Sequence, residues 1–394
     1  KRQSGLMSKS RGVPSAFRGR SGERCPWSQR LLAASVFLAA AGWATCYEAR
    51  SDEKARTSVV NWEAQKRGPK SALSVAWIGH SLMEHKANST WGQVELMSLV
   101  SKFAESRKLF YAMTDHTLFG SPLSALWRGK PHSFSRDAGE MIAKREEFER
   151  NAGRYDAIVL TEAIPLAGTM KHEFSAYYLR RFSCTLLKAN PQARVYLYQT
   201  WVHFQGSHHG AAKIAPVGFD WRAEMKAERA LWEELADAAS KPAVEAPNWL
   251  RRLGWSSVSD GGCAIEGPIY SVPVGNALLA LDERLSATKS GDRFLWPDGK
   301  PFQMIDIVAN PMLDPHSAGA TLRDPSNPMD DIHASFVGIY FAALVHFATL
   351  YRQSPVNLPY PSELGEGLAR SLQCVAWGAV VSDARAGVLG EARC

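Results

Sequence analysis

The stretch VAWIGHSLMEH, residues 75–85, places an apolar run directly before a glycine, a histidine and a serine. Its apolar and β-branched residues are typical of a buried β-strand. Gly79 ends the run, and Ser81 follows two residues later. In a parallel sheet, ligands bind outside the carboxyl ends of the strands. The stretch therefore predicts that the Ser81 hydroxyl stands at the ligand-binding edge of a sheet.

Further along the chain, apolar runs of strand length alternate with amphipathic stretches, which is the pattern of a parallel sheet flanked by helices. The last core segment is apolar nearly all round, which is typical of a buried helix. The sequence thus predicts a three-layer α/β/α domain with a central parallel sheet of about five strands. We expect strands at residues 73–79, 109–113, 156–162, 194–200 and 268–274, and helices at residues 91–107, 138–151, 174–190, 221–239, 275–285 and 334–351.

Composition divides the 394-residue chain into four predicted parts. Residues 1–47 are a basic leader with an apolar segment, and residues 48–70 are a polar linker. Residues 71–360 form the α/β domain, and residues 361–394 add a terminal helix and tail. A content of 45% apolar and 22% charged residues is that of a globular protein with a sizeable core.

The net charge of +7 is concentrated at the start of the chain. Residues 1–30 hold eight basic residues and one acidic residue, so the remainder is formally neutral. A neutral domain offers no basic surface to phosphates, and we therefore exclude nucleic acid as a partner.

The uncharged segment 31–47 follows this basic stretch directly. A basic region before a short apolar one is typical of a secretory signal, and an uncleaved membrane anchor is the alternative. We therefore expect the protein to be exported or held at a membrane through residues 31–47. The six cysteines include no C-x-x-C pair, and their pairing does not follow from the sequence.

A serine is a weak nucleophile unless a base activates it. The motif MDDIHASFVGIY, residues 329–340, places Asp330 three residues before His333. At that spacing the carboxylate can orient the imidazole while the other ring nitrogen faces the ligand. The same residues also suit a helix start, where Asp330, Asp331 and Ser335 would cap amides. The two roles are compatible.

A second pair, Asp314 and His316 in MLDPHSAG, is an alternative source of the base. Its proline and polar neighbours are more typical of a loop turn. We therefore expect His333, not His316, to act on Ser81.

These motifs resemble those of the SGNH (GDSL-like) hydrolase superfamily. Its Gly-x-Ser-Leu block near the start and Asp-x-x-His block near the end are matched by residues 79–82 and 330–333. LFGSPLSALW, residues 118–127, is similar to the second block, and YDAIVLTEAIPL, residues 155–166, stands in the place of the third. The likeness spans roughly residues 73–352 and is to a bacterial branch of the superfamily.

The resemblance implies the flavodoxin-like α/β/α fold of that superfamily and a serine esterase mechanism. Ser81 would be the nucleophile, His333 the base and Asp330 the residue that orients it. The backbone amides of Ser81 and Gly120 would form the oxyanion hole. No metal and no organic cofactor is implied.

The chain departs from the superfamily in the third block, where relatives carry an asparagine that donates to the oxyanion. This chain has Thr161 and Glu162 there. An ionised carboxylate aimed at the oxyanion would repel it, so Glu162 either turns aside to bind a group such as a backbone amide, or stays protonated and donates. We favour the first arrangement, with a hydrated carboxylate and the Thr161 hydroxyl as a further donor.

The stretch WVHFQGSHHG holds His203, His208 and His209, a set that would suit a metal. No carboxylate accompanies these histidines, so we expect a solvated loop and no metal. Trp201 and His203 follow the fourth predicted strand, where they would line the substrate crevice.

The sequence therefore predicts a serine esterase that cleaves an O-acyl group, an O-acetyl group above all, from a small molecule or a carbohydrate. One alternative is an O-acyltransferase that passes the acyl group to an envelope polysaccharide. Another is a non-catalytic carbohydrate-binding protein, in which the altered third block has impaired the oxyanion hole.

Overall fold

The structure is a computed structural model in which the chain divides into two units, residues 1–60 and 61–394. The predicted leader and nearly all of the predicted linker lie outside the described residues. Within the described residues, no helix is long and apolar enough to cross a bilayer. The structure describes residues 68–130, 137–204, 219–241, 265, 267–287, 294–308 and 332–392.

A five-stranded parallel sheet forms the centre of the second unit. Its strand order is β4-β1-β5-β6-β7. In chain order these are strands 2-1-3-4-5, the order of flavodoxin-like doubly wound folds. The predicted fold class is therefore confirmed. The strands are β1 (Ala72–Ile78), β4 (Phe110–Asp115), β5 (Ala157–Leu160), β6 (Arg194–Tyr198) and β7 (Tyr270–Val272).

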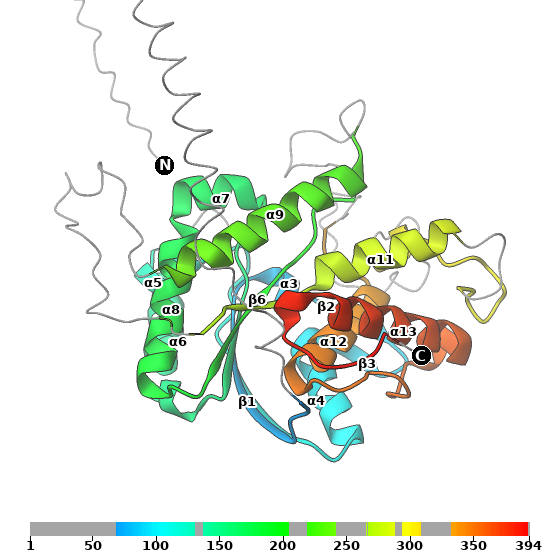
Figure 1. Ribbon diagram of the computed structural model, residues 1–394, viewed down its shortest axis with the longest axis horizontal. Coiled ribbons are helices and arrows are strands. Elements are labelled where there is room, and N and C mark those ends of the chain that lie inside the picture. Colours follow the sequence, from blue (N-terminus) through cyan, green and yellow to red (C-terminus); the bar gives the residue numbers. More distant parts are fainter. Residues whose placement is uncertain are drawn as a thin grey trace, which may run out of the picture. The chain divides into compact units, whose positions relative to one another are not determined.

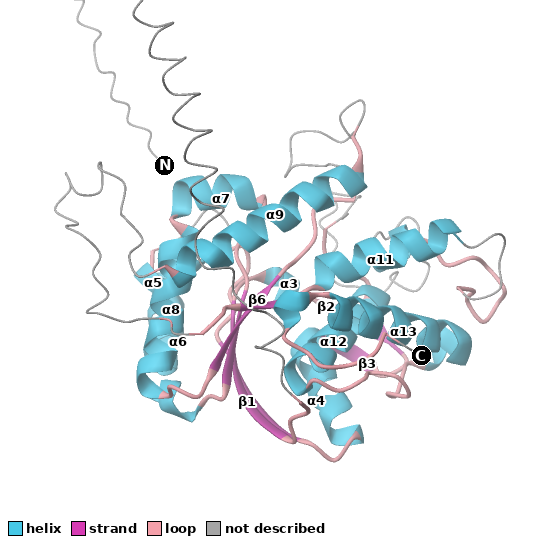
Figure 2. Cartoon of the chain, in the orientation of Figure 1, coloured by secondary structure: helices cyan, strands magenta, loops and turns pink. Residues whose placement is uncertain are grey.

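Helices cover both faces of this sheet, as Figures 1 and 2 show. Successive side chains of a strand point to opposite faces, so Val75 and Trp77 of β1 join one apolar cluster and Ala76 and Ile78 join the other. The first cluster packs against α4 (Leu96–Ser106), α11 (Val274–Ala287), α12 (Phe336–Tyr351) and α13 (Gly365–Ser382). The second packs against α5 (Leu123–Arg128), α6 (Ala138–Asn151), α7 (Leu166–Glu173), α8 (Ser175–Ala189) and α9 (Trp221–Ser240).

The helix predicted to be buried on all sides is α12, and each of its residues is buried. It lies between α4 and α13, so no side faces water. The predicted terminal helix is α13, which inserts Leu368, Leu372 and Val375 into the same core. The side-chain amide of Gln373 donates to the Tyr340 hydroxyl at 2.9 Å and satisfies a polar group between the two helices.

The helix expected at residues 91–107 begins later than predicted. Residues Gly92–Glu95 form β3, which pairs antiparallel with β2 (Lys86–Ser89). Gly92 has a φ of 83°, which suits the tight turn of a hairpin and not a helix. The sequence also missed α3 (Ser81–Glu84), α5 and α7, because such short helices contain too few turns to show a helical period. Four 3₁₀ turns complete the described elements: η1 (Ala152–Arg154), η2 (Met304–Ile307), η4 (Ser362–Leu364) and η5 (Ala384–Ala386).

Gly338 allows α12 to approach the η2 turn closely, and its replacement tests that contact. A Cβ at position 338 would lie 2.1 Å from the carbonyl oxygen of Ile307. We expect Gly338→Ala to lower the free energy of unfolding by about 1–3 kcal/mol, as overpacking does. Gly378→Ala in α13 is the matched control, because nothing lies within 4 Å of its Cβ position. That change should raise the free energy by about 0.4–1 kcal/mol. Denaturant unfolding measures both, and equal effects would contradict the prediction.

Candidate active site

The hydroxyl of Ser81 lies next to the imidazole of His333, although 252 residues separate them in the chain. The Ser81 Oγ and His333 Nε2 atoms are 2.9 Å apart. Ser81 is the first residue of α3, directly beyond β1, and His333 lies just before α12. At this distance an unprotonated Nε2 can accept the hydroxyl proton, which is how a base activates a serine. The structure thus joins the first and last sequence motifs.

Gly79 lets the end of β1 lie close against its neighbours. A Cβ at position 79 would be 2.5 Å from Cγ2 of Thr161 and 2.9 Å from Sδ of Met83. Both distances are far below the contact distance of non-bonded atoms. The glycine of the first motif is therefore required by packing at the point where the chain turns toward Ser81.

The segment that carries His333 is fixed by hydrogen bonds from three directions. The indole Nε1 of Trp201 donates to the carbonyl of Ile332 at 2.8 Å. The backbone N–H of Ser335 donates to the carbonyl of Ile307 at 2.9 Å, and the Ser335 hydroxyl caps α12 by accepting from the N–H of Gly338. The predicted helix-cap role of Ser335 is thus confirmed. It also helps to hold His333 against Ser81.

Two aromatic rings stack near His333, and sequence reasoning missed both. The ring of His85 lies 4.9 Å from the imidazole between centroids, with 23° between the planes. The ring of Phe119 lies 5.9 Å away at the same angle, and half of this side chain is exposed. His85 ends the quoted motif, but no spacing rule connects it with His333. Only the fold brings these rings together.

Several predicted residues lie outside the described part of the chain. Asp330, expected to orient His333, is one, and Asp314 and His316 of the alternative pair are others. His208 and His209 also lie outside it. Among the described residues, no group of three or more histidine, cysteine, aspartate or glutamate side chains is placed to hold a metal ion.

Gly120 lies in the segment between β4 and α5, residues 116–122, which we call the Gly120 loop. The loop is tied to the end of β1 because the N–H of Leu118 donates to the carbonyl of Gly79 at 2.9 Å. Gly120 has a φ of 62°, a conformation that favours glycine. Among the described residues, no partner accepts from the backbone N–H of Gly120 or of Ser81.

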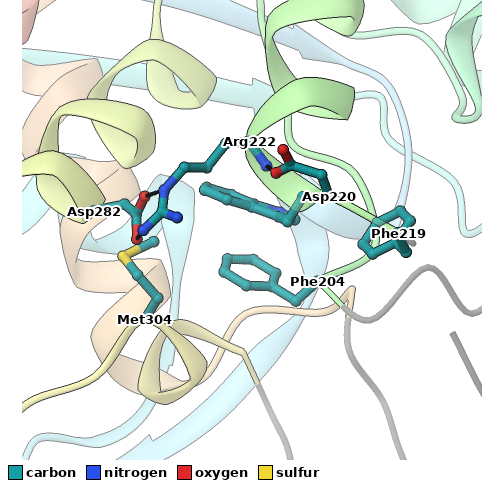
Figure 3. Close-up of a pocket in the computed structure, with 7 residues that line it drawn as sticks. Phe204, Phe219, Asp220, Arg222, Asp282 and Met304 are labelled. Carbon is teal, nitrogen blue, oxygen red and sulfur yellow. Dashed lines mark hydrogen bonds and ion pairs between the residues drawn. The ribbon is translucent and has the colours of Figure 1, made fainter. Parts of the chain in front are cut away.

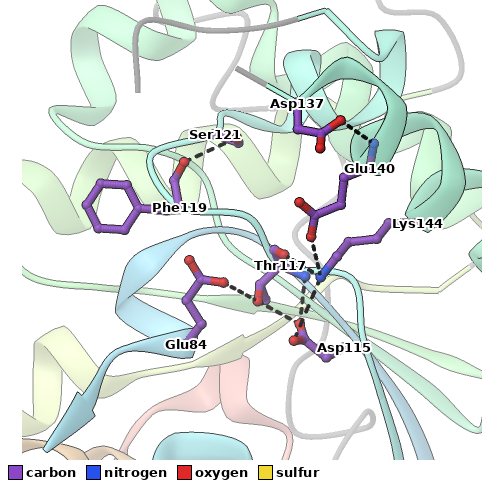
Figure 4. A network of polar contacts seen from close by, with 8 residues as sticks. All are labelled: Glu84, Asp115, Thr117, Phe119, Ser121, Asp137, Glu140 and Lys144. Atoms are coloured by element: carbon purple, nitrogen blue, oxygen red, sulfur yellow. Dashed lines mark hydrogen bonds and ion pairs between the residues drawn. The ribbon is translucent and has the colours of Figure 1, made fainter. Parts of the chain in front are cut away.

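A network of polar contacts fixes the other end of this loop (Figure 4). The Thr117 hydroxyl contacts Asp115 Oδ1 at 2.6 Å and Glu84 Oε2 at 3.1 Å, and Lys144 Nζ donates to the Thr117 carbonyl at 2.8 Å. Lys144 also pairs with Glu140 at 3.7 Å. Burial raises the pKa of the Glu84 carboxyl, and the hydrogen bond from Thr117 partly opposes this shift. Because Glu84 belongs to α3, the network links the loop to the helix that carries Ser81.

Glu162 is fully buried, so the expectation of a hydrated carboxylate is wrong. Its Oε1 atom accepts from the backbone N–H of Leu123 at 3.1 Å and of Ala163 at 2.8 Å, so the side chain turns aside to bind amides. Burial raises the pKa of the carboxyl to about 7, although these amides and the Ser175 hydroxyl favour its charged form. Neither Oε2 nor the Ser175 Oγ completes a hydrogen bond of normal geometry within the described residues.

Thr161 and His80, the neighbours of Glu162 and Ser81, are also buried. The Thr161 hydroxyl donates to the carbonyl of Tyr198 at 3.0 Å, so its proton is engaged within the sheet and not offered to an oxyanion. The ring Nε2 of His80 lies 3.0 Å from the carbonyl of Glu162. Burial, together with a smaller effect of the nearby His333, lowers the pKa of His80 to about 4, so the ring is neutral at pH 7.

Trp201 and His203 follow β6, as predicted, but Trp201 does not line an open crevice. Only 1% of its surface is exposed, because its ring packs in the core while its N–H holds Ile332. His203 is also buried. Trp201 therefore acts on the candidate site through the backbone before His333.

No protein-family model matches the chain, and no curated protein matches it significantly. Several solved structures do. A DUF4886 family protein from Bacteroides uniformis has a TM-score of 0.46 and 14% identity, covering 79% of this chain and 95% of that one. A two-domain esterase active on acetylated mannans has a TM-score of 0.34 and 10% identity, covering 77% of this chain and 54% of that one.

A GDSL-like lipase described from Parabacteroides merdae has a TM-score of 0.32 and 12% identity, covering 72% of this chain and 96% of that one. At these low identities, the roles of individual residues rest on the geometry of this chain.

Proposed function

We propose that the protein is a serine esterase of the SGNH type that cleaves an O-acyl ester through an acyl-enzyme. The observation that carries the proposal is the 2.9 Å contact between Ser81 Oγ and His333 Nε2. This contact lies at the carboxyl ends of the parallel strands, the edge where such sheets bind their ligands.

In the proposed reaction, Ser81 Oγ attacks the acyl carbon while its proton passes to His333 Nε2. The resulting tetrahedral oxyanion is held by the backbone amides of Ser81 and Gly120. Collapse of this intermediate breaks the ester bond, and His333 returns the proton to the leaving alcohol. Water, deprotonated by His333, then attacks the acyl carbon, the bond to Ser81 Oγ breaks as His333 returns the proton to it, and the acid leaves. Asp330 orients the imidazole, and no metal or organic cofactor takes part.

For the substrate, we propose an O-acyl group, with O-acetyl first, on a carbohydrate or a small alcohol. A pocket of about 460 Å³, lined by residues of the segment after β6, the start of α9, α11 and η2, supports a carbohydrate (Figure 3). Phe204 and Trp221 stack in it with centroids 4.8 Å apart, and a flat aromatic face suits the apolar face of a sugar ring. The Trp221 Nε1 atom is buried without a hydrogen-bond partner among the described residues.

Charged groups on the other side of the pocket can bind hydroxyls. Arg222 and Asp282 form an ion pair there, with Arg222 Nη2 and Asp282 Oδ1 3.0 Å apart. A sugar held in this pocket also supports the alternative of acyl transfer, because its hydroxyl could replace water in the second step. Analysis of the products distinguishes the two reactions.

We also propose that the protein is exported or anchored through residues 31–47. The basic and then apolar leader supports this, and so do Cys184 and Cys374, each of which is disulfide-bonded. Disulfides persist in oxidising compartments outside the cytosol. We expect fractionation of the native host to place the chain in the exported or membrane fraction. Recovery of intact chain in the soluble cytosolic fraction would contradict the proposal.

Replacement of the paired residues tests the esterase proposal. We expect Ser81→Ala and His333→Ala each to lower the kcat for p-nitrophenyl acetate by at least about 10³-fold, because the nucleophile and its base act as one unit. Ser81→Ala should also abolish labelling by a fluorophosphonate probe. Ser98→Ala and His172→Ala, at exposed helical positions, are the matched controls and should keep wild-type rates. Wild-type turnover in Ser81→Ala would exclude the mechanism.

The orienting carboxylate is tested by a matched pair of neighbours. Asp330→Asn should lower kcat by up to about 10⁴-fold, as loss of the carboxylate can in such triads. Asp331→Asn should change kcat little, because its spacing does not suit the orientation of His333. Equal losses at both positions would show that the two aspartates act as helix caps or surface charge.

The pocket in Figure 3 predicts a difference between large and small substrates. We expect Trp221→Ala to raise the KM for chemically O-acetylated cellopentaose roughly tenfold, a loss of about 1.4 kcal/mol of binding. The KM for p-nitrophenyl acetate should not change, because that ester is too small to need the pocket. Phe110→Ala, at an exposed apolar side chain that begins β4, is the control. Unchanged KM values for both esters in Trp221→Ala would show that the pocket is not part of the substrate site.

A further inference from the structure

We propose that Glu162 is a positioning residue that holds the Gly120 loop in place relative to Ser81. Its consequence for catalysis rests on the proposed esterase function, whereas the positioning is a property of the fold. Three segments are involved, and each follows the carboxyl end of a different strand. They are the Gly120 loop after β4, residues 79–81 after β1, and Glu162 after β5.

The strand order explains why one side chain can link these segments. β1 lies between β4 and β5, and neighbouring strands are about 4.8 Å apart. Glu162, which follows β5, accepts at 3.1 Å from the N–H of Leu123, which follows β4. Its own carbonyl meets His80 Nε2 at 3.0 Å. One residue therefore binds both the end of the Gly120 loop and the residue before Ser81.

The Leu123 amide needs this acceptor. Leu123 begins α5, and the preceding Pro122 has no side-chain group that can cap the helix. The first N–H groups of a helix have no partner within it, and a buried N–H without any partner is costly. Leu123 is fully buried, so its amide has no contact with bulk water that could replace Glu162. Loss of the carboxyl oxygen would therefore leave the end of the loop unfastened.

The hydrogen bonds of the Glu162 carboxyl also predict which substitution keeps the loop in position. Oε1 carries both amide hydrogen bonds, whereas Oε2 is buried without a partner and lies near the Ser175 hydroxyl. Glutamine keeps an acceptor in place of Oε1 and places an NH₂ donor beside the Ser175 oxygen. Alanine keeps neither group. The hydrogen bond to the Leu123 amide should thus be kept in Glu162→Gln and lost in Glu162→Ala.

Steady-state kinetics with p-nitrophenyl acetate measures the effect. We expect Glu162→Ala to lower kcat about 100-fold, since displacement of a catalytic group by about 1 Å can cost that much. KM should change little, because an oxyanion hole acts mainly in the transition state. Glu162→Gln should stay within about fivefold of the wild-type kcat. An unchanged kcat in Glu162→Ala, or an equal loss in Glu162→Gln, would overturn the proposal.

Glu228 provides a matched control for the loss of a buried carboxyl. Its Oε1 accepts from the N–H of Leu166 at 3.0 Å, and Leu166 begins α7 after Pro165. As at Leu123, the amide is that of a fully buried leucine after a proline, and its acceptor is a buried glutamate, but α7 does not carry the proposed oxyanion amides. Glu228→Ala should therefore lower stability and leave the kcat of the folded enzyme unchanged. A loss of kcat as large as that in Glu162→Ala would mean that destabilisation alone explains both.

A pair of variants at Leu123 removes the amide without touching Glu162. Leu123→Pro deletes the N–H, and proline suits the first position of a helix after an extended residue such as Pro122. Leu123→Ala loses similar packing but keeps the N–H. We expect kcat to be at least about tenfold lower in Leu123→Pro than in Leu123→Ala. Equal values would overturn the proposal.

Hydrogen exchange separates this inference from the esterase proposal. If the wild-type protein hydrolyses no ester and resists the fluorophosphonate probe, the esterase proposal fails, but the positioning role remains measurable. We expect backbone amides of residues 118–126 to exchange at least about tenfold faster in Glu162→Ala than in wild type or Glu162→Gln. Unchanged exchange in Glu162→Ala would overturn the positioning role, whatever the activity.

Discussion

The hydrogen bond between Ser81 and His333 depends on a meeting of chain segments from opposite ends of the domain. Ser81 follows the first strand, and His333 precedes the buried helix α12. The position of each segment depends on a glycine. Gly79 permits close contact with Thr161 beside Ser81, and Gly338 permits close contact with Ile307 beside His333. A difference of about 1 Å in either contact would disturb the alignment that proton transfer needs. The site therefore depends first on the close packing that these two glycines allow.

Buried polar groups then determine how the segments beside Ser81 are held. His80 and Glu162 are both inside the protein, where a charged group is costly unless it finds partners. Burial lowers the pKa of His80 to about 4 and raises that of Glu162 to about 7, so desolvation favours the neutral form of each group. Both bind the backbone, His80 to a carbonyl and Glu162 to amides. Their polarity thus fixes the turns around the nucleophile.

The sequence predicted the sheet well because buried parallel strands are apolar on both faces, as the run before Gly79 shows. It also predicted His333 as the partner of Ser81, because each of the two motifs consists of residues that lie close together in the chain. It failed where contacts between distant segments decide the outcome. The burial of Glu162, the stacking of His85 and Phe119 on His333, and the engagement of the Thr161 hydroxyl all depend on strand order. No local pattern records those contacts.

The hydrogen bonds of Thr161 and Glu162 explain what these two residues do in the third motif. Under the proposed mechanism, the oxyanion has two backbone donors, because Thr161 is engaged by Tyr198 and Glu162 by amides. With fewer donors, each must be placed more accurately to give the same stabilisation, since electrostatic catalysis depends on preorganisation. The Gly120 loop is accordingly fastened to Gly79, to the network around Thr117 and, through Leu123 directly after it, to Glu162. Under this proposal, the Glu162 carboxyl does not donate to the oxyanion but binds the Leu123 amide, directly after the loop that carries the proposed donor Gly120.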